Sequence, residues 1–202
     1  MLDRRLLVAT HNQGKVVEFR RMLSLDGVEV IGLADIGIED EIEETGQTFR
    51  ENASLKASSF ARLAGIPTLA DDSGLVIDYL SGRPGIRSAR YAGEGSSDSE
   101  RMEKVLSEMS DASSEQRTAR FICALCVADE NGDPLAEVAG VCEGMIVHAP
   151  RGENGFGYDP IFQPNGFDKT VGELGADIKD SISHRSNAIS KIIPFLQGFF
   201  NI

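Results

Sequence analysis

Residues 5–23 read RLLVATHNQGKVVEFRRML, and this stretch decides the fold class. Its first six residues are mostly apolar, which is typical of a buried strand. A polar turn follows, and then Val16, Phe19 and Leu23 recur at helical spacing over residues 13–23. A strand, a turn and a helix in this order indicate an α/β protein.

The sequence predicts two further helices from their first residues. Thr48 and Glu51 form a capping box, in which each side chain bonds the other's backbone N–H, and Gly65 is suited to end that helix. Ser97 and Glu100 repeat the pattern before a second helix. Both helices therefore have predicted starting points.

The predicted strands lie at residues 66–70, 75–80, 120–128 and 134–147. An acidic pair, Asp71 and Asp72, separates the first two strands, so we expect it at a strand end or in a tight turn. Asn131 and Gly132 predict a hairpin turn between the last two strands.

A last helix is predicted from about residue 183, and no internal repeat is present. A length of 202 residues suits one substantial core, so the sequence predicts a single mixed α/β domain over residues 1–202. The polar clusters fall mainly at the ends of elements, where binding and catalytic sites are commonly built.

Composition narrows the classes of function. The 20 Lys and Arg residues against 32 Asp and Glu give a net charge of −12, which disfavours bulk nucleic-acid binding. No apolar run approaches the roughly 20 residues that cross a bilayer, and no signal-peptide cleavage pattern follows the first apolar residues. We therefore expect a soluble protein with neither a membrane nor a nucleic-acid partner.

The three cysteines do not pair evenly. Cys123 and Cys126 have CxxC spacing, but alternation along an apolar strand puts them on opposite faces. Together with Cys142 they are best explained as core residues in a reducing compartment, so we expect a cytoplasmic location.

The first polar cluster lies between the first strand and the first helix. A helix N-terminus presents N–H groups and partial positive charge, a glycine there allows close backbone approach, and a lysine adds a full charge, as a triphosphate requires. The spacing is not that of a Walker A loop, and an ordinary helix start is the simpler alternative. The cluster comprises Thr10, His11, Asn12, Gln13, Gly14 and Lys15.

Two further clusters are acidic, Glu43 with Glu44 and Asp71 with Asp72. Mg²⁺ prefers oxygen ligands and keeps several waters, so one or two carboxylates plus substrate phosphates suffice to hold it. Another carboxylate would take a proton from the attacking water. The alternative is a pair of solvated turns, but Asp71 and Asp72 lie between apolar residues, where carboxylates need partners.

The fourth cluster is aromatic and cationic. An aromatic ring can stack on a nucleotide base, and a cation or backbone donor can read a keto oxygen. A buried aromatic turn and an ordinary helix cap are the alternatives. The cluster comprises Phe156, Gly157, Tyr158, Asp159, Lys179, His184 and Arg185.

Six segments in order closely resemble the inosine triphosphate pyrophosphatase family: ATHNQGKVVEF, EETGQTFRENASLKA, LADDSGLVIDYLSGRPGIRSARYAGE, GFGYDPIF, KTVGEL and SHRSNA. The resemblance implies an elongated α/β fold, with a central mixed sheet and a nucleotide-binding cleft between two lobes. It also implies a homodimer, a Mg²⁺ cofactor, and cleavage of ITP, dITP and XTP to the monophosphate and pyrophosphate. Such cleavage removes deaminated purine nucleotides from the pool.

The same motifs suggest roles for single residues. The first cluster resembles the family's triphosphate-contacting loop, and Ser73 looks like a substrate contact. Asp72 resembles the catalytic carboxylate, which accepts a proton and binds the metal. Glu43 resembles the other metal ligand, with Glu44 left open as the alternative. The fourth cluster resembles the nucleotide and base contacts.

Three other functions fit parts of the pattern. A phosphomonoesterase with an aspartyl nucleophile would release orthophosphate, but that chemistry wants DxD spacing, and Asp71 and Asp72 are adjacent. A nucleotide-binding sensor without catalytic turnover would need only the phosphate-binding residues of the first cluster. A protein-interaction module would leave all four clusters unexplained. The pattern therefore favours the pyrophosphatase.

Overall fold

A computed structural model describes residues 4–202 of the chain; the first three residues, which precede the first predicted strand, lie outside the described part. The elements in chain order are β1 (Arg5–Val8), α1 (Gln13–Met22), β2 (Glu29–Gly32), α2 (Phe49–Ala64), β3 (Thr68–Ile77), α3 (Asp98–Glu108), β4 (Thr118–Ala128), β5 (Pro134–Ile146), β6 (Phe162–Pro164), α4 (Ala176–Ile182) and α5 (His184–Phe200).

The strands form one sheet in the order β2-β1-β3-β4-β5-β6. β1 pairs in parallel with β2 and with β3, whereas β5 and β6 pair antiparallel. The sheet is therefore mixed, and the predicted α/β class with a central mixed sheet is confirmed. No helix within residues 4–202 is long and apolar enough to span a bilayer.

The chain divides into two compact units. Unit 1 comprises the chain up to Asp72, residues 123–140 and residues 185–202, and unit 2 comprises residues 73–122 and 141–184. The single domain over residues 1–202 stays a prediction.

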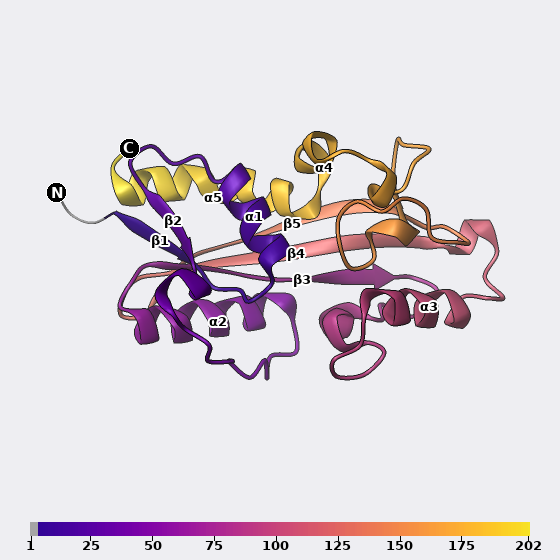
Figure 1. Cartoon of the computed structure of the whole chain (residues 1–202), viewed down its shortest axis with the longest axis horizontal. Helices are drawn as coiled ribbons and strands as arrows, with labels where there is room; N and C mark the ends of the chain where they lie inside the picture. The colour runs from indigo at the N-terminus through magenta and orange to yellow at the C-terminus, as the bar shows by residue number, and fades with distance from the viewer. Residues whose placement is uncertain (1–3) are drawn as a thin grey trace. The chain divides into compact units, whose positions relative to one another are not determined.

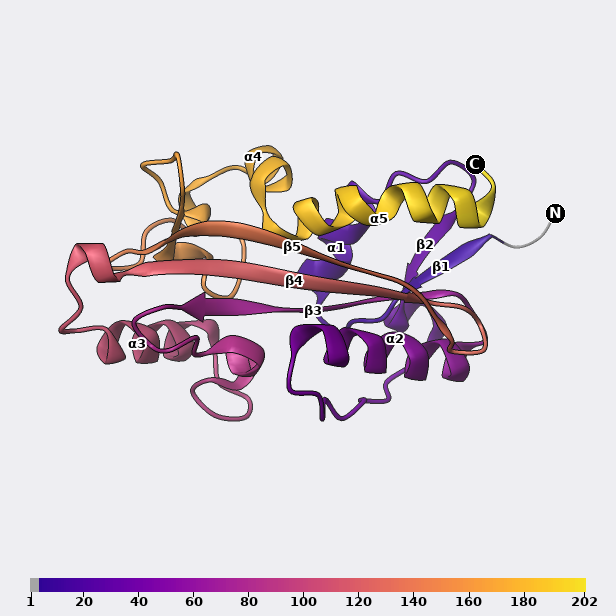
Figure 2. The same ribbon diagram turned by 180° about the vertical axis from the view of Figure 1, so that it is seen from behind.

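Helices cover both faces of the sheet in unit 1. Figures 1 and 2 show α1 and α5 on one side of the strands and α2 on the other. Phe19 and Ile192 pack in one apolar cluster and Phe60 in a second. Cys123 belongs to the first cluster and Cys126 to the second, which confirms that they lie on opposite faces. Burial raises the pKa of Cys123 to about 12 and that of Cys126 to about 11, so both thiols stay protonated.

Unit 2 has a core of its own. Ile77 of β3, Val105 of α3 and Phe162 of β6 belong to a single buried cluster, together with Met109, which directly follows α3. Helix α3 begins where the capping box predicted, because Ser97 accepts a bond from the N–H of Glu100 through its side chain. α2 likewise begins after Thr48 and ends at Gly65, whose φ of 64° is left-handed and suits glycine.

β3 corrects the predicted strand pattern. The sequence predicted two strands with a turn at residues 71–74, but β3 runs unbroken from Thr68 to Ile77. Asp71 is 1% exposed and Asp72 is 6% exposed, so both carboxylates are largely withdrawn from bulk water. Cations on the neighbouring helices meet both charges, so the chain has no need to turn outward to solvate them.

Candidate functional site

The two aspartates of β3 point to opposite faces of the sheet, because successive side chains in a strand alternate. Asp71 meets Lys15 of α1 and Arg185 of α5, which cover one face. Asp72 meets Lys56 of α2, which covers the other face. The two aspartates, which the sequence presents as one acidic pair, therefore lie in two different environments.

Asp71 lies within a network of buried ion pairs in unit 1. Its Oδ2 is 2.9 Å from Lys15 Nζ and 3.5 Å from Arg185 Nη2, and Arg185 also bonds Glu18. Burial alone would raise the pKa of Asp71, but Lys15, Arg185 and Lys56 outweigh that effect and hold the pKa well below its usual range. Asp71 is therefore ionised at neutral pH, and it holds Lys15 in the first turn of α1.

Asp72 has the opposite electrostatic character. Its Oδ1 lies 3.3 Å from Lys56 Nζ, and its Oδ2 accepts a hydrogen bond of 3.2 Å from Asn52 Nδ2. Burial raises the pKa of Asp72, although Lys56 opposes the shift. Neighbouring carboxyls with pKa values displaced in opposite directions are typical of divided roles, and here Asp72 is the one suited to accept a proton.

Two carboxylates from separate segments converge on one ammonium group. Lys56 Nζ is 2.6 Å from Glu44 Oε1 and 3.3 Å from Asp72 Oδ1. Burial would lower the pKa of Lys56, but the carboxylates, Asp72 first, outweigh it and raise the pKa. The structure thus brings Glu44 to Asp72, whereas Glu43 is exposed. Glu44 is thus the glutamate that pairs with Lys56, and Glu43 as metal ligand, with Glu44 as the alternative, stays a prediction.

This donor set suits a hard divalent cation. Glu44 and Asp72 offer only oxygen atoms, which Mg²⁺ prefers. Within residues 4–202 there is no group of three or more His, Cys, Asp or Glu side chains that would hold a metal ion by themselves. Two carboxylates fit Mg²⁺ nonetheless, because it usually retains waters and takes further oxygens from substrate phosphates.

The first cluster forms the start of α1, as predicted. Asn12 is the N-cap residue, and its side chain accepts a 3.1 Å hydrogen bond from the backbone N–H of Lys15. The N–H of Asn12 donates in turn to Thr10 Oγ1 at 3.2 Å. Gln13 is exposed and Gly14 is half-buried. The cluster therefore presents a capped helix N-terminus beside a lysine, an arrangement that favours anions.

His11 links the first cluster to the segment that runs from Asp40 to Glu44. Its Nε2 lies 2.9 Å from the carbonyl oxygen of Asp40, and its ring makes an edge contact with Phe60 at 6.1 Å between centroids. The His11 side chain therefore connects the turn before α1 with the segment that leads to Glu44.

The fourth cluster lies in unit 2 except for Arg185, which belongs to unit 1 and pairs there with Glu18 and Asp71. Lys179 Nζ is 2.7 Å from Asp159 Oδ2 and lies over the ring of Phe156, 4.6 Å from its centroid. The same Asp159 oxygen accepts the N–H of Phe156 at 3.0 Å, and Asp98 accepts the N–H of Gly157 at 2.6 Å. The ammonium and the aromatic ring are thus fixed together by a buried carboxylate.

The other predicted unit 2 residues have different surroundings. Tyr158 is buried in the core, where burial raises the pKa of its hydroxyl, which donates to the carbonyl of Ser88 at 2.8 Å. His184 stacks on Phe121 at 4.8 Å between centroids and 16° between planes. Ser73 is half-buried within β3. Tyr158 therefore contributes to the core, whereas the Phe156 side chain is only half-buried.

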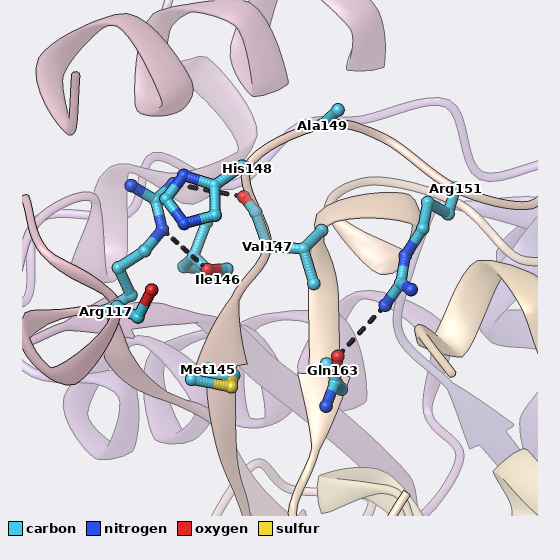
Figure 3. A pocket seen from close by; sticks show the side chains of 9 residues that line it. Arg117, Met145, Ile146, Val147, His148, Ala149, Arg151 and Gln163 are labelled. Atoms are coloured by element: carbon cyan, nitrogen blue, oxygen red, sulfur yellow. Dashed lines mark hydrogen bonds between the residues drawn. The ribbon is translucent and has the colours of Figure 1, made fainter. Parts of the chain in front are cut away.

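A separate cavity of about 350 Å³ lies in unit 2 and contains none of the predicted site residues. Figure 3 shows Arg117 bonded to backbone oxygens at its edge. The Arg117 guanidinium donates to the carbonyls of Ile146, Met109 and Val147 at 2.8, 3.0 and 3.0 Å, so it serves the fold. The cavity is lined by Ser114, Arg117, Met145, Ile146, Val147, His148, Ala149, Arg151 and Gln163.

Asn52 and Lys56 were not among the residues predicted from the sequence. Both lie on α2 four residues apart, which places them on one face of the helix. That spacing, two polar residues beside the apolar stripe of Ala53 and Phe60, is the signal that could have identified them.

Comparisons with known proteins cover nearly the whole chain. A model of the Ham1 family matches residues 6–195. The chain is 52% identical over 192 residues to a dITP/XTP pyrophosphatase of Bacillus subtilis (strain 168), covering 95% of this chain and 96% of that relative. It is 50% identical over 187 residues to a dITP/XTP pyrophosphatase of Geobacillus kaustophilus (strain HTA426), covering 93% and 91%. A solved structure of a HAM1 protein from Coxiella burnetii matches with a TM-score of 0.87 at 40% identity, covering 96% of this chain and 99% of that one.

The family match includes all four polar clusters, from Thr10 to Arg185. It therefore confirms the resemblance carried by the six sequence motifs. Sequence identity near one half over almost the full length, together with a matching fold, shows that the chain and these proteins are homologous. The chain belongs to the Ham1 family.

Proposed function

We propose that this protein is a magnesium-dependent nucleoside triphosphate pyrophosphatase that hydrolyses dITP, XTP and ITP to the monophosphate and pyrophosphate. The observation that carries the proposal is the convergence of Glu44 and Asp72 on Lys56, in a chain half identical to dITP/XTP pyrophosphatases. Acting on deaminated purine nucleotides, the enzyme would keep these bases out of DNA and RNA.

Glu44 and Asp72 would hold the Mg²⁺ ion of this enzyme. When bound, Mg²⁺ neutralises charge on phosphate oxygens and favours attack on phosphorus. The two carboxylates come from different segments, so the site depends both on the loop before α2, which carries Glu44, and on β3, which carries Asp72. Lys56 supplies a positive charge at the same place and is suited to meet the phosphates as well.

The reaction requires a proton acceptor and a means to stabilise negative charge. Asp72 would accept a proton as a water oxygen bonds to the α-phosphorus and the bond to the bridging oxygen of pyrophosphate breaks. Burial raises the pKa of Asp72, which makes it a better base than a solvated aspartate. Lys15 and the N-terminus of α1 would stabilise the charge that gathers on the leaving pyrophosphate.

Residues of unit 2 would recognise the base. Phe156 offers an aromatic face, and Lys179 is held against its ring by Asp159. A donor such as the backbone N–H of His184 would bond a 6-keto oxygen, whereas the 6-amino group of adenine would oppose that donor. An unpaired buried polar group costs about 1–3 kcal/mol, enough to disfavour adenine.

A single assay tests the proposed reaction. The purified protein is incubated with Mg²⁺ and ITP, XTP, dITP, GTP, ATP or dUTP, and pyrophosphate and orthophosphate are measured separately. We expect pyrophosphate from ITP, XTP and dITP, no orthophosphate, and loss of turnover with EDTA that added Mg²⁺ restores. Orthophosphate with a phosphoenzyme would indicate the phosphomonoesterase instead, and binding without any product would indicate a sensor.

We also propose that the enzyme is a cytoplasmic homodimer with a nucleotide as its small-molecule partner and with no nucleic-acid partner. The resemblance supports the dimer, and the three buried free cysteines fit a reducing compartment. Light scattering after size exclusion measures the dimer directly, and a monomer at micromolar concentration would contradict it.

A further inference from the structure

Asn52 connects two parts of the proposed metal site in unit 1. Its side chain is 0% exposed and lies in the first turn of α2. Its Oδ1 accepts the backbone N–H of Gly46 at 2.8 Å, and its Nδ2 donates to Asp72 Oδ2 at 3.2 Å. One amide group therefore bonds both the loop that carries Glu44 and the strand that carries Asp72.

An amide is well suited to this position. Asp72 has one oxygen toward Lys56 and the other toward Asn52, so the plane of the carboxylate is fixed from both sides. The amide donates a hydrogen bond without adding charge, so it orients Asp72 without weakening the attraction for a cation.

The loop before α2 packs directly against the same turn of helix. A Cβ atom at Gly46 would lie 2.6 Å from Asn52 Oδ1 and 2.7 Å from Glu51 Cβ, closer than real Cβ contacts. Glu51 Oε2 accepts the N–H groups of Gln47 and Thr48 at 2.7 and 3.0 Å. Three successive backbone N–H groups of the loop are thus bonded by two adjacent side chains, of which only Asn52 also reaches β3.

We propose that Asn52 is a positioning residue that sets the distance between the Glu44 and Asp72 carboxylates and thereby the affinity for the divalent cation. The inference rests on the proposed function for its kinetic consequence. Binding of a metal ion without nucleotide tests the positioning separately. Outer partners of metal ligands typically contribute 10- to 100-fold in affinity or activity, so we expect an effect of about that size.

The experiment compares three variants with the wild-type protein. Asn52→Ala removes both hydrogen bonds, Asn52→Asp keeps the acceptor for Gly46 but loses the donor to Asp72, and Thr48→Ala removes the helix cap without touching Asp72. Mn²⁺ binding is followed by electron paramagnetic resonance without nucleotide, kcat and KM are measured with ITP, and thermal denaturation reports folding.

We expect Asn52→Ala to weaken Mn²⁺ binding by about 10-fold or more, with Thr48→Ala close to wild type. Asn52→Asp, assayed at about pH 8 where carboxyl groups are ionised, should lower kcat by about 10- to 100-fold with KM little changed. Because the aspartate retains the loop contact and lies near Lys56, this variant carries the test if the alanine variant does not fold.

Two results would overturn the inference. If Asn52→Asp keeps wild-type kcat, the residue only shapes the loop. If Thr48→Ala weakens Mn²⁺ binding as much as Asn52→Ala, the effect belongs to the helix start in general. A wild-type protein that binds Mn²⁺ but releases no pyrophosphate would refute the proposed function while leaving the metal-binding comparison decisive for Asn52.

Discussion

Asp72→Asn is expected to lower kcat for ITP hydrolysis by about 10²- to 10⁴-fold, the usual loss when a proton acceptor is removed. The amide keeps the size of the side chain and its contact with Asn52, but it accepts no proton and attracts a cation only weakly. Initial rates of pyrophosphate release with saturating ITP and Mg²⁺ measure the effect.

Folding of the Asp72→Asn variant should be unimpaired. Because burial raises the pKa of Asp72, the folded protein holds its proton more tightly than the unfolded chain does, and stability falls as pH rises through that pKa. Removing the charge at neutral pH should therefore leave the melting temperature unchanged or slightly higher. Asp78→Asn, at an exposed aspartate paired with Arg120, serves as the control and should keep normal turnover. Near-normal kcat in Asp72→Asn would contradict the catalytic role.

The helices α1, α2, α3 and α5 were predictable from the sequence, and the starts of α2 and α3 are determined by local capping residues. The Thr48 and Ser97 caps lie where their capping boxes placed them, and Gly65 ends α2 in a left-handed conformation. β2, of four residues, and α4, of seven, lie in stretches for which the sequence predicted no element. Elements this short show too few repeats of a hydrophobic period to be recognised.

The continuous strand β3 could not be predicted, because its stability depends on partners far away in sequence. Two adjacent aspartates followed by Ser-Gly are typical of a turn when the cations are unknown. Lys15, Lys56 and Arg185, from three different helices, supply those cations. Local sequence carries no information about that convergence.

The same limit applies to the proposed metal ligands. The sequence left Glu43 and Glu44 open, since adjacent glutamates in a loop have equal chemistry. The position of Lys56 distinguishes them, because its ammonium reaches Glu44. Asn52, in turn, has no titratable group, so a search for catalytic residue types overlooks it.

Arg185→Met should destabilise the protein by about 3–5 kcal/mol, because it leaves buried carboxylates without their partner. The Arg185 side chain is 1% exposed and pairs with Glu18 and Asp71, which are themselves buried. Urea denaturation at neutral pH measures the loss. Arg20→Met is the matched control: its pair with Asp35 is exposed, so its removal should cost at most about 1 kcal/mol. Equal stability of the two variants would contradict the network.

The loss from Arg185→Met should shrink as pH falls. In the wild-type protein the pKa of Asp71 is held below its unfolded value of about 4, so its stabilisation is complete above that pH and declines below it. Without Arg185, burial of Asp71 is less compensated, so Asp71 in the folded variant binds a proton more readily. Denaturation at about pH 3, below the unfolded pKa of about 4, should therefore show a smaller difference from wild type than at about pH 7. Because the Arg185 guanidinium is engaged by these carboxylates, substitution should reduce stability whether or not it alters the preference for ITP over ATP.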